Sequence, residues 1–250
     1  ELVNRAFDIY PIKSMTTYTT DNFQLVSMDT QSFVKDYNSH RWNINLITRI
    51  IQYMNHPVKF NLKHEAPFQN KQVAKAPSVF RLPKKLLLNI LSGLTARYFG
   101  KKEPIIINSY MHKILEMKLQ LSLGCLPKLW QTPEPGPYQE PILDRRGIFT
   151  WRENYQGFEQ FVRDILPEVF PLCFLESYSR LKQIAESMKW PENPHFIFTS
   201  NNFNTDEIFK IWVAEKKALY NTPYLIGQHG NYQAHKSVYH WPEIKTADRF

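Results

Sequence analysis

Glycine and cysteine are scarce in this 250-residue sequence, and no long hydrophobic run occurs. The eight glycines form neither a Gly-x-Gly-x-x-Gly nor a Walker pattern, which argues against kinases and dinucleotide-dependent enzymes. Cys125 and Cys173, the two cysteines, stand among apolar residues; they support neither a disulfide framework nor a zinc site and favour a reducing compartment. With no signal segment and no apolar run of roughly 18 residues, we expect a soluble, cytoplasmic protein.

The composition is that of a folded protein. Its 43% hydrophobic and 14% aromatic content provides a sizeable core, as one large domain or two small ones, and a mean hydropathy of −0.44 implies a well-charged surface. The chain opens on Glu1 and stops at "TADRF", where an apolar strand could begin. We therefore expect residues 1–250 to be part of a longer polypeptide.

Positive charge is concentrated in the first half of the chain. Residues 1–130 hold 18 Lys and Arg against 8 Asp and Glu, whereas residues 131–250 hold 13 against 15. Eight basic residues surround one apolar segment: Lys71, Lys75, Arg81, Lys84, Lys85, Arg97, Lys101 and Lys102. They suit phosphates, a nucleotide or an anionic lipid surface, or they form a solvated basic face without a ligand. Nucleic acid is disfavoured because no helix-turn-helix, zinc-finger or RNP pattern accompanies the charge.

Apolar spacing predicts several elements in the first part of the chain. We expect an amphipathic helix over 32–54, a second helix over 83–104, a strand within 104–110 and a third helix over 112–124. Four prolines and a glycine in 131–141 exclude regular structure and indicate a loop or hinge.

The last third of the chain predicts a strand–helix–strand unit. Helical periodicity over 157–188 is interrupted by prolines, so we expect two helices or one kinked helix. Apolar strands at 196–198 and 224–226 flank a helix whose amino-terminal cap is Asn204 or Thr205. The apolar face of this helix is formed by Ile208, Ile211, Trp212 and Leu219.

Two strands joined by such a crossover are parallel, and the connection between them is right-handed. The polar segments "TSNN" and "GQHGN" then lie at one edge of the sheet, together with "NSY" at 108–110. Because ligands bind at the carboxyl edge of open parallel sheets, this edge is the predicted site. The predicted fold is α/β, with a Rossmann-like parallel sheet flanked by helices.

His229 is the residue in this edge with the most chemical capacity. It stands between Gly227 and Gly230, which permit an unusual backbone conformation and the close approach of a ligand. Its imidazole can act as a general base for an attacking hydroxyl or donate to a phosphate, and Gln228 can orient a hydroxyl or carbonyl. The alternative is that His229 only satisfies a neighbouring backbone group.

Other chemistries fit the sequence poorly. His235 and His240, with Glu243 or Asp248, match no metal-ligand spacing, and no His-Glu-x-x-His pattern exists. There is no Gly-x-Ser-x-Gly elbow, and the apolar context of Cys173 indicates a core position, so a serine or cysteine hydrolase is disfavoured.

The order of several segments carries a family resemblance. "RWNINLITRIIQYM", "KLQLSLGCLPKLWQTPEP", "FPLCFLESYSRL", "PHFIFTSNNFNTDEIFKIWVAEKK" and "TPYLIGQHGN" through "EIKTADRF" resemble the transferases encoded in bacterial O-antigen and surface-polysaccharide gene clusters. The resemblance covers most of the chain and is strongest over 194–250. The strand-end His-Gly is also similar to that of teichoic-acid glycerophosphotransferases, which have a GT-B arrangement of two Rossmann-like domains.

The resemblance implies that residues 1–250 form the amino-terminal, acceptor-side domain of a GT-B transferase, without its carboxyl-terminal nucleotide-binding domain. It implies a nucleotide-activated donor without another cofactor, a lipid-linked or glycan acceptor, and peripheral contact with the anionic inner-membrane surface. His229 is then the catalytic residue. The substrate-binding candidates are Gln228, Gly230, Gly227, Ser200, Asn201, Lys210, Glu243, Asp248 and Arg249.

One departure from the family pattern supports an alternative function. Relatives usually carry a glycine-rich stretch after Gln-His-Gly, whereas this chain has "NYQAHKSVYHW". The altered stretch favours a noncatalytic, degenerate module that binds a glycan or nucleotide, and the retained Gln-His-Gly favours the enzyme.

Overall fold

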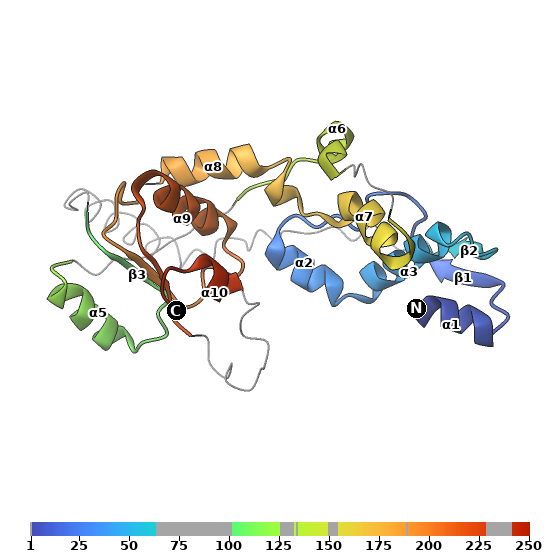
Figure 1. Ribbon diagram of the computed structural model, residues 1–250, viewed down its shortest axis with the longest axis horizontal. Coiled ribbons are helices and arrows are strands. Elements are labelled where there is room, and N and C mark those ends of the chain that lie inside the picture. The colour runs from blue at the N-terminus through green and yellow to red at the C-terminus, as the bar shows by residue number, and fades with distance from the viewer. Residues whose placement is uncertain are drawn as a thin grey trace, which may run out of the picture. The chain divides into compact units, whose positions relative to one another are not determined.

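The computed structural model describes residues 2–63, 102–125, 133, 135–149, 155–188, 190–228 and 242–250. The chain divides into two compact units, one formed by Glu1–Val73 with Pro137–Tyr178 and the other by Ala74–Gly136 with Ser179–Phe250. Each unit has its own small parallel sheet, and helices accompany both sheets (Figure 1). The protein is therefore α/β. The helix predicted at 83–104 lies almost wholly outside the described residues.

The first unit carries a two-stranded parallel sheet in which Ser14 pairs with Lys59. Sequence reasoning missed both strands because each is four residues long and neither is predominantly apolar. The elements of this unit are α1 (Leu2–Ile9), β1 (Ser14–Thr17), α2 (Thr30–Tyr37), α3 (His40–Tyr53), β2 (Lys59–Leu62), α6 (Leu143–Arg146), the 3₁₀ turn η2 (Gly147–Phe149), α7 (Gly157–Val169) and the 3₁₀ turn η3 (Leu172–Phe174).

The prediction of a single helix over 32–54 is wrong. The segment forms two helices, α2 and α3, which are separated by Asn38 and Ser39. Ser39 has extended backbone angles, and its side chain accepts a hydrogen bond from the Trp42 amide at 3.1 Å. The serine cap starts a new helix within the segment, although the apolar pattern itself shows no break there.

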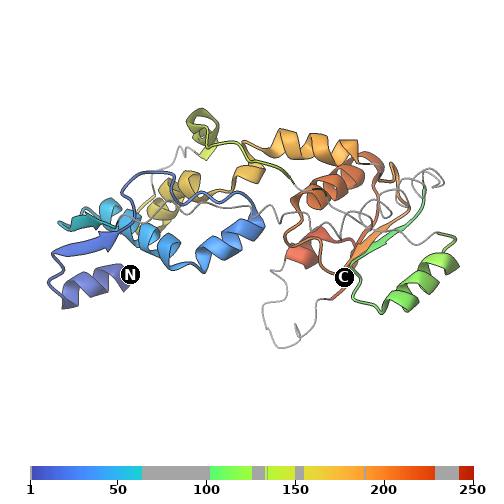
Figure 2. The same ribbon diagram turned by 180° about the vertical axis from the view of Figure 1, so that it is seen from behind.

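The second unit carries the three-stranded parallel sheet on which the predicted site depends. Its strands lie in the order β3-β4-β5, and Ile105, Ile197 and Tyr224 stand in register. Figures 1 and 2 show α9 on one side of this sheet and α5 on the other. The elements are β3 (Ile105–Ile107), α5 (Lys113–Ser122), α8 (Tyr178–Ser187), β4 (Ile197–Thr199), α9 (Glu207–Tyr220), β5 (Tyr224–Ile226) and α10 (Pro242–Thr246).

The strand–helix–strand prediction is confirmed, with two corrections in α9. The helix is capped by Asp206, whose Oδ1 accepts from the Phe209 amide at 3.0 Å, and not by Asn204 or Thr205. Leu219 is 68% exposed, although Ile208, Ile211 and Trp212 are buried as expected. A helix of 14 residues is longer than strands of three residues, so its last turn extends beyond the sheet.

The remaining predictions concern the linking segments. Helical periodicity over 157–188 resolves into two helices, α7 and α8, with η3 between them. Within 131–141, the described residues 133 and 135–141 contain neither helix nor strand, as their prolines indicate. No helix in the described ranges is long and apolar enough to cross a membrane.

Candidate functional site

The segments that follow β3, β4 and β5 meet at the carboxyl edge of the sheet. The Ser200 amide donates to the Asn108 carbonyl at 3.1 Å, and the Ser200 hydroxyl donates to the Ser109 carbonyl at 3.2 Å. The Gly227 amide donates to the Thr199 carbonyl at 2.9 Å. These bonds join the "NSY", "TSNN" and "GQ" segments, which is the convergence that the parallel topology predicts.

The turn after β3 has an unusual backbone. Asn108 has φ +46° and Tyr110 has φ +58°, and the buried Ser109 lies between them. Two non-glycine residues with positive φ within three positions are costly and persist only where the surroundings impose them. Here Ser109 is held by its hydroxyl, which donates to Glu116 at 2.6 Å and accepts from the Met111 amide at 3.2 Å.

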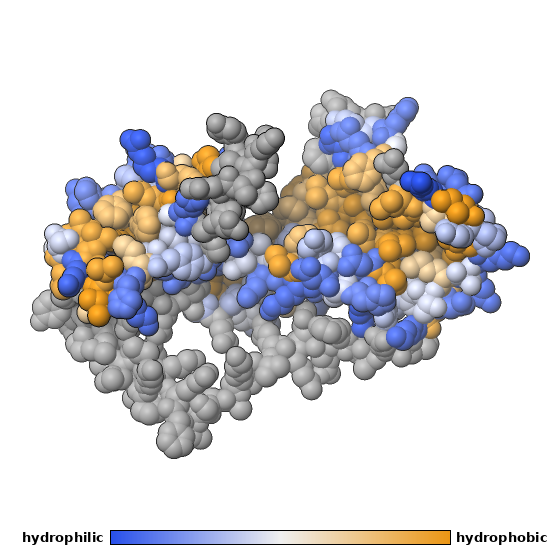
Figure 3. All heavy atoms as spheres, turned by 90° about the horizontal axis from the view of Figure 1, so that it is seen from below, coloured by the Kyte–Doolittle hydropathy of each residue, from blue (hydrophilic) through white to orange (hydrophobic). Residues whose placement is uncertain are grey.

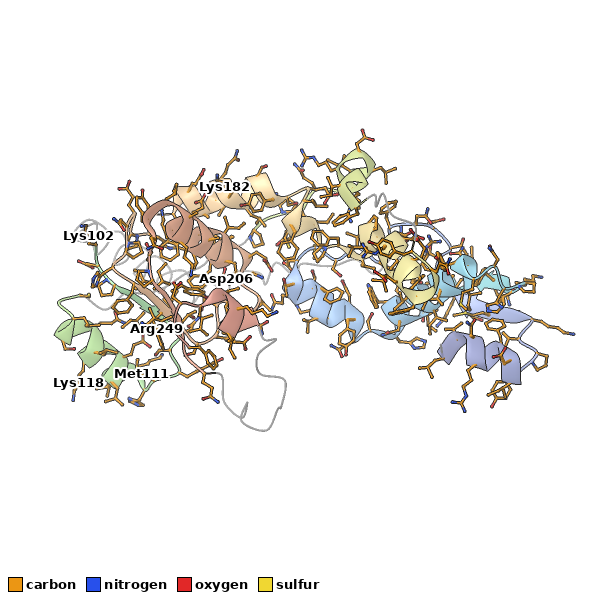
Figure 4. All side chains as sticks on the ribbon, in the orientation of Figure 1. Lys102, Met111, Lys118, Lys182, Asp206 and Arg249 are labelled. Carbon is orange, nitrogen blue, oxygen red and sulfur yellow. The ribbon has the colours of Figure 1, made fainter. Side chains whose placement is uncertain are left out.

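Asn202 links the turns after β3 and β4 to the start of α9, and sequence reasoning did not single it out as a site residue. Its Oδ1 accepts hydrogen bonds from the Asn108 side-chain amide and, at 3.4 Å, from the Thr199 hydroxyl. Its Nδ2 donates to Asp206 at 2.9 Å, and Asp206 in turn caps α9. The buried amide therefore fixes the turns after two strands against the start of the crossover helix. Figure 4 labels Asp206 at the beginning of α9.

Gly227 occupies a position with no room for a side chain. A Cβ atom there would lie 2.4 Å from the Ser200 Oγ and 2.8 Å from the Phe198 ring. The close approach expected of this glycine is thus made to the neighbouring strand of the protein. Glycine is required by space, because φ at Gly227 is not positive.

Two side-chain amides at this edge retain unused hydrogen-bonding capacity. Asn201 is half-buried and Gln228 is exposed, and neither amide has a hydrogen-bond partner within the part of the chain that the structure describes. Each can offer two N–H donors and one carbonyl acceptor to a ligand. His229 and Gly230, which follow Gln228, lie outside the described residues.

Comparison with known proteins assigns the chain to a protein family. Residues 2–250 match the family described as LIC12162 family transferase. The chain belongs to this family. No curated protein and no solved structure matches it.

In this LIC12162 family transferase, the start of α9 is occupied by carboxylates. Asp206 caps the helix, and the buried Glu207 forms an ion pair with Lys210 at 2.8 Å. Lys210 Nζ also donates to the Asn204 carbonyl at 3.4 Å. An anion at this helix terminus would meet two carboxylates.

Three other predicted site residues lie elsewhere in the second unit: Asp248, Arg249 and Glu243. Asp248 lies at the amino end of β5, where its carboxylate accepts from the Tyr224 amide at 2.7 Å and pairs with Lys217 at 2.7 Å. The hydrogen bond from Lys217 and that from the Tyr224 amide hold the pKa of Asp248 below its ordinary value. Arg249 pairs through its backbone with β5, and the buried Glu243 belongs to α10. Asp248 is thus at the edge opposite Ser200 and Gln228.

Metal ligands are not grouped in the described ranges. No three His, Cys, Asp or Glu side chains come together there in a way that could hold a metal ion. His235 and His240 lie outside those ranges. Cys125 and Cys173 are both buried, and the core position predicted for Cys173 is confirmed.

Proposed function

We propose that this chain binds the acceptor of a glycosyl or glycerophospho transfer in bacterial surface-polysaccharide or O-antigen synthesis. The observation that carries the proposal is the hydrogen-bonded network at the carboxyl edge, which leaves the amides of Asn201 and Gln228 available to a ligand. Side-chain amides beside buried hydroxyls suit the hydroxyl groups of a sugar or polyol. Membership of a transferase family supplies the reaction class.

In the proposed reaction, an acceptor hydroxyl attacks the anomeric carbon or the phosphorus of a nucleotide-activated donor. The new bond forms to the acceptor oxygen, and the bond to the leaving nucleotide phosphate breaks, with its electrons remaining on the nucleotide. The proton of the attacking hydroxyl passes to His229, which follows directly after the edge residue Gln228. Imidazole is suited to this step because its pKa lies near neutral pH.

The remaining candidates take different parts in the proposal. Gln228 and Asn201 orient acceptor hydroxyls, and Ser200 holds the turn after β3 in place. Gly227 allows the close approach of Ser200 and Phe198, and Gly230 permits the close approach of a ligand. Lys210 supports the start of α9 beside the edge, whereas Glu243, Asp248 and Arg249 support the fold elsewhere in the unit, given the ion pairs, burial and strand pairing described above.

The charge distribution supports a division of labour within a larger enzyme. The carboxylates at the start of α9 make this edge a poor phosphate site, so the nucleotide would bind to a second domain, as in a GT-B arrangement. Residues 1–250 would then form the acceptor-side half. A lipid-linked acceptor would place the enzyme at the cytoplasmic face of the inner membrane.

The proposal is tested by product analysis with the full-length protein. It is incubated with a set of nucleotide-activated sugars and polyols together with lipid-linked and glycan acceptors, and products are identified by mass spectrometry. We expect His229→Ala to lower kcat by about 10²- to 10⁴-fold, because it removes the general base. His195→Ala is the matched control: this exposed histidine precedes β4 at the opposite edge, and its loss should leave turnover unchanged.

Two results would count against the enzyme. Wild-type turnover by a folded His229→Ala variant would remove the proposed base. Binding of nucleotide or glycan by calorimetry, without any product, would instead support the noncatalytic module that the segment after Gly230 favours.

A further inference from the structure

Helix α5 exposes an unusual amount of apolar surface. Along its length the structure leaves five large apolar side chains exposed, with exposed fractions of 57% for Ile114, 58% for Leu115, 48% for Met117, 38% for Leu119 and 55% for Leu121. Single exposed apolar residues are normal, but a group on one helix indicates an interaction surface. Figure 3 shows apolar side chains gathered among charged ones on the left of that view, where α5 lies.

Two polar side chains of α5, those of Glu116 and Gln120, face the body of the protein. Glu116 accepts from the Ser109 hydroxyl at 2.6 Å and from the Gln120 amide at 3.1 Å, and Gln120 is 5% exposed. A surface helix normally turns its apolar face inward and its polar face outward. Helix α5 has the reverse orientation, and the described residues of this unit leave its apolar side chains exposed.

The outward face also carries positive charge. Lys118 follows Ile114 by four residues and Leu115 by three, and it precedes Leu121 by three. This helical spacing places Lys118 in the middle of the apolar surface. Figure 4 shows Lys118 on α5 at the periphery of the unit, and Lys113 at the start of the helix is also exposed. Neither lysine forms an ion pair within the described ranges. The acidic residue of α5, Glu116, is engaged on the inner side.

We propose that α5 is an interfacial helix that docks this protein onto an anionic phospholipid bilayer. Ile114, Leu115 and Leu121 enter the boundary between headgroups and acyl chains, while Lys118 extends along the surface to lipid phosphates. Apolar side chains interspersed with lysine are the combination that binds such an interface, where the lysine stem is buried and its ammonium reaches the phosphates.

Charge decides against two other occupants. A second copy packed symmetrically on the same face would bring the two Lys118 ammonium groups into a shared apolar interface without a carboxylate. Residues 64–100 of this chain contain six Lys and Arg and one acidic residue, so that segment offers Lys118 no excess of carboxylates. An anionic lipid surface satisfies both the apolar residues and the lysines.

The position of α5 gives the docking a consequence for the candidate site. The helix begins six residues after β3 ends, and Glu116 holds the Ser109 turn that forms part of the carboxyl edge. Docking through α5 therefore brings this edge near the bilayer surface, where a lipid-linked acceptor would be presented. The docking itself does not depend on the proposed transfer reaction.

Vesicle sedimentation with the full chain tests the proposal in the absence of any donor or acceptor. We expect binding to phosphatidylcholine vesicles that contain phosphatidylglycerol, and weaker binding to phosphatidylcholine alone. Leu115→Ser should lower the partition coefficient at least about tenfold, and Lys118→Gln about fivefold. The matched controls are Leu219→Ser on α9 and Lys245→Gln on α10, both exposed, which should bind as the wild type does.

Three results would overturn the proposal. The first is no binding to anionic vesicles at low salt. The second is binding that the α5 variants and the control variants weaken equally. The third is a dimer in analytical ultracentrifugation that Leu115→Ser dissociates while vesicle binding is unchanged, because the face would then serve self-association. None of these experiments measures turnover, so their outcomes do not depend on whether the proposed transfer reaction occurs.

Discussion

At the scale of single residues, the candidate site depends on how closely β4 and β5 approach each other. The Ser200 hydroxyl fills the space next to position 227 and donates to the Ser109 carbonyl, so one buried serine contacts both neighbouring segments. Any side chain at position 227 would displace Ser200 or the Phe198 ring. The geometry of the edge thus depends on a single glycine.

Substituting this glycine should damage both stability and the site. In Gly227→Ala, the new methyl group would lie 2.4 Å from the Ser200 Oγ, and we expect a loss of about 1–3 kcal/mol in the free energy of unfolding from overpacking. Gly147→Ala is the control: its Cβ meets nothing within 4 Å and its φ is −59°, so it should be neutral or slightly stabilising. Urea unfolding measures both. Equal stability of the two variants would contradict the close approach.

The sequence predicts part of this site, for a physical reason. Strand periodicity and crossover topology are local signals, so they place Ser200, Asn201 and Gln228 at one edge correctly. The partnership between Asn202 and Asn108, which are 94 residues apart, depends on the folded arrangement. Only the occurrence of Asn202 in the "TSNN" turn could have drawn attention to it.

At the scale of elements, the first unit is held by a buried ion pair. Arg146 at the end of α6 donates to both carboxylate oxygens of Glu176, at 2.7 and 3.0 Å, and both side chains are almost fully buried. Arg146 also donates to the carbonyls of Pro167 and Phe170, and Glu176 accepts from the Ile142 amide. The pair thereby connects α6, the end of α7 and the segment after η3.

The pKa of Glu176 makes this pair sensitive to acid. Burial by itself would raise the pKa, but the hydrogen bonds from Arg146 and from the Ile142 amide outweigh it, and the pKa lies below the ordinary value. A carboxyl group whose pKa is lowered by folding stabilises the fold above its unfolded-state pKa of about 4.3. That stabilisation is lost as the pH falls through the lower folded-state pKa.

Glu176→Gln should therefore destabilise the first unit and weaken its dependence on acid pH. We expect a loss of about 3–5 kcal/mol at pH 7, because Arg146 would remain buried without its counter-charge. The control is Glu159→Gln, which breaks an exposed pair with Arg163 and should change stability by under about 1 kcal/mol. Denaturation midpoints between pH 7 and pH 3 measure both effects. A wild-type slope below pH 4 in Glu176→Gln would show that another carboxyl group is responsible.

Element boundaries show where sequence reasoning fails. The periodicity of 32–54 continues across Asn38 and Ser39, yet the Ser39 cap divides it into two helices. The apolar face predicted for α9 includes Leu219, but the strands are so short that the last turn of the helix has no sheet to pack against. In both cases the pattern identifies the element type, and the end is set by a cap or by the size of a neighbouring element.

At the scale of the whole molecule, both compact units are discontinuous in sequence. The first combines Glu1–Val73 with Pro137–Tyr178, and the second combines Ala74–Gly136 with Ser179–Phe250. Sequence composition is consistent with one domain or two, but contacts between distant segments cannot be read from local pattern, so this interleaving could not be foreseen. The assignment of residues 1–250 to one acceptor-side domain of a larger transferase stays a prediction.

The interleaving makes removal of residues 179–250 a test of how far the units fold independently. In a chain that ends at Tyr178, β3 loses β4 and β5, and a three-residue strand has no stable structure alone, so the amides of Ile105–Ile107 should exchange rapidly with solvent. The first unit keeps its own bonds, including the buried Thr17–Thr48 hydroxyl pair at 2.7 Å and the Arg49–Glu168 pair at 2.6 Å. Its amides in α3 and α7 should therefore stay protected.

Hydrogen exchange followed by mass spectrometry distinguishes the outcomes peptide by peptide, with the full chain as reference. Slow exchange confined to the first unit is expected, because the ion pairs and hydroxyl contacts named for it join only residues within 1–73 and 137–178. If α3 and α7 exchange as fast as β3 in the shortened chain, the first unit depends on contacts with the second. The buried Arg146–Glu176 pair would then be insufficient to hold its elements together.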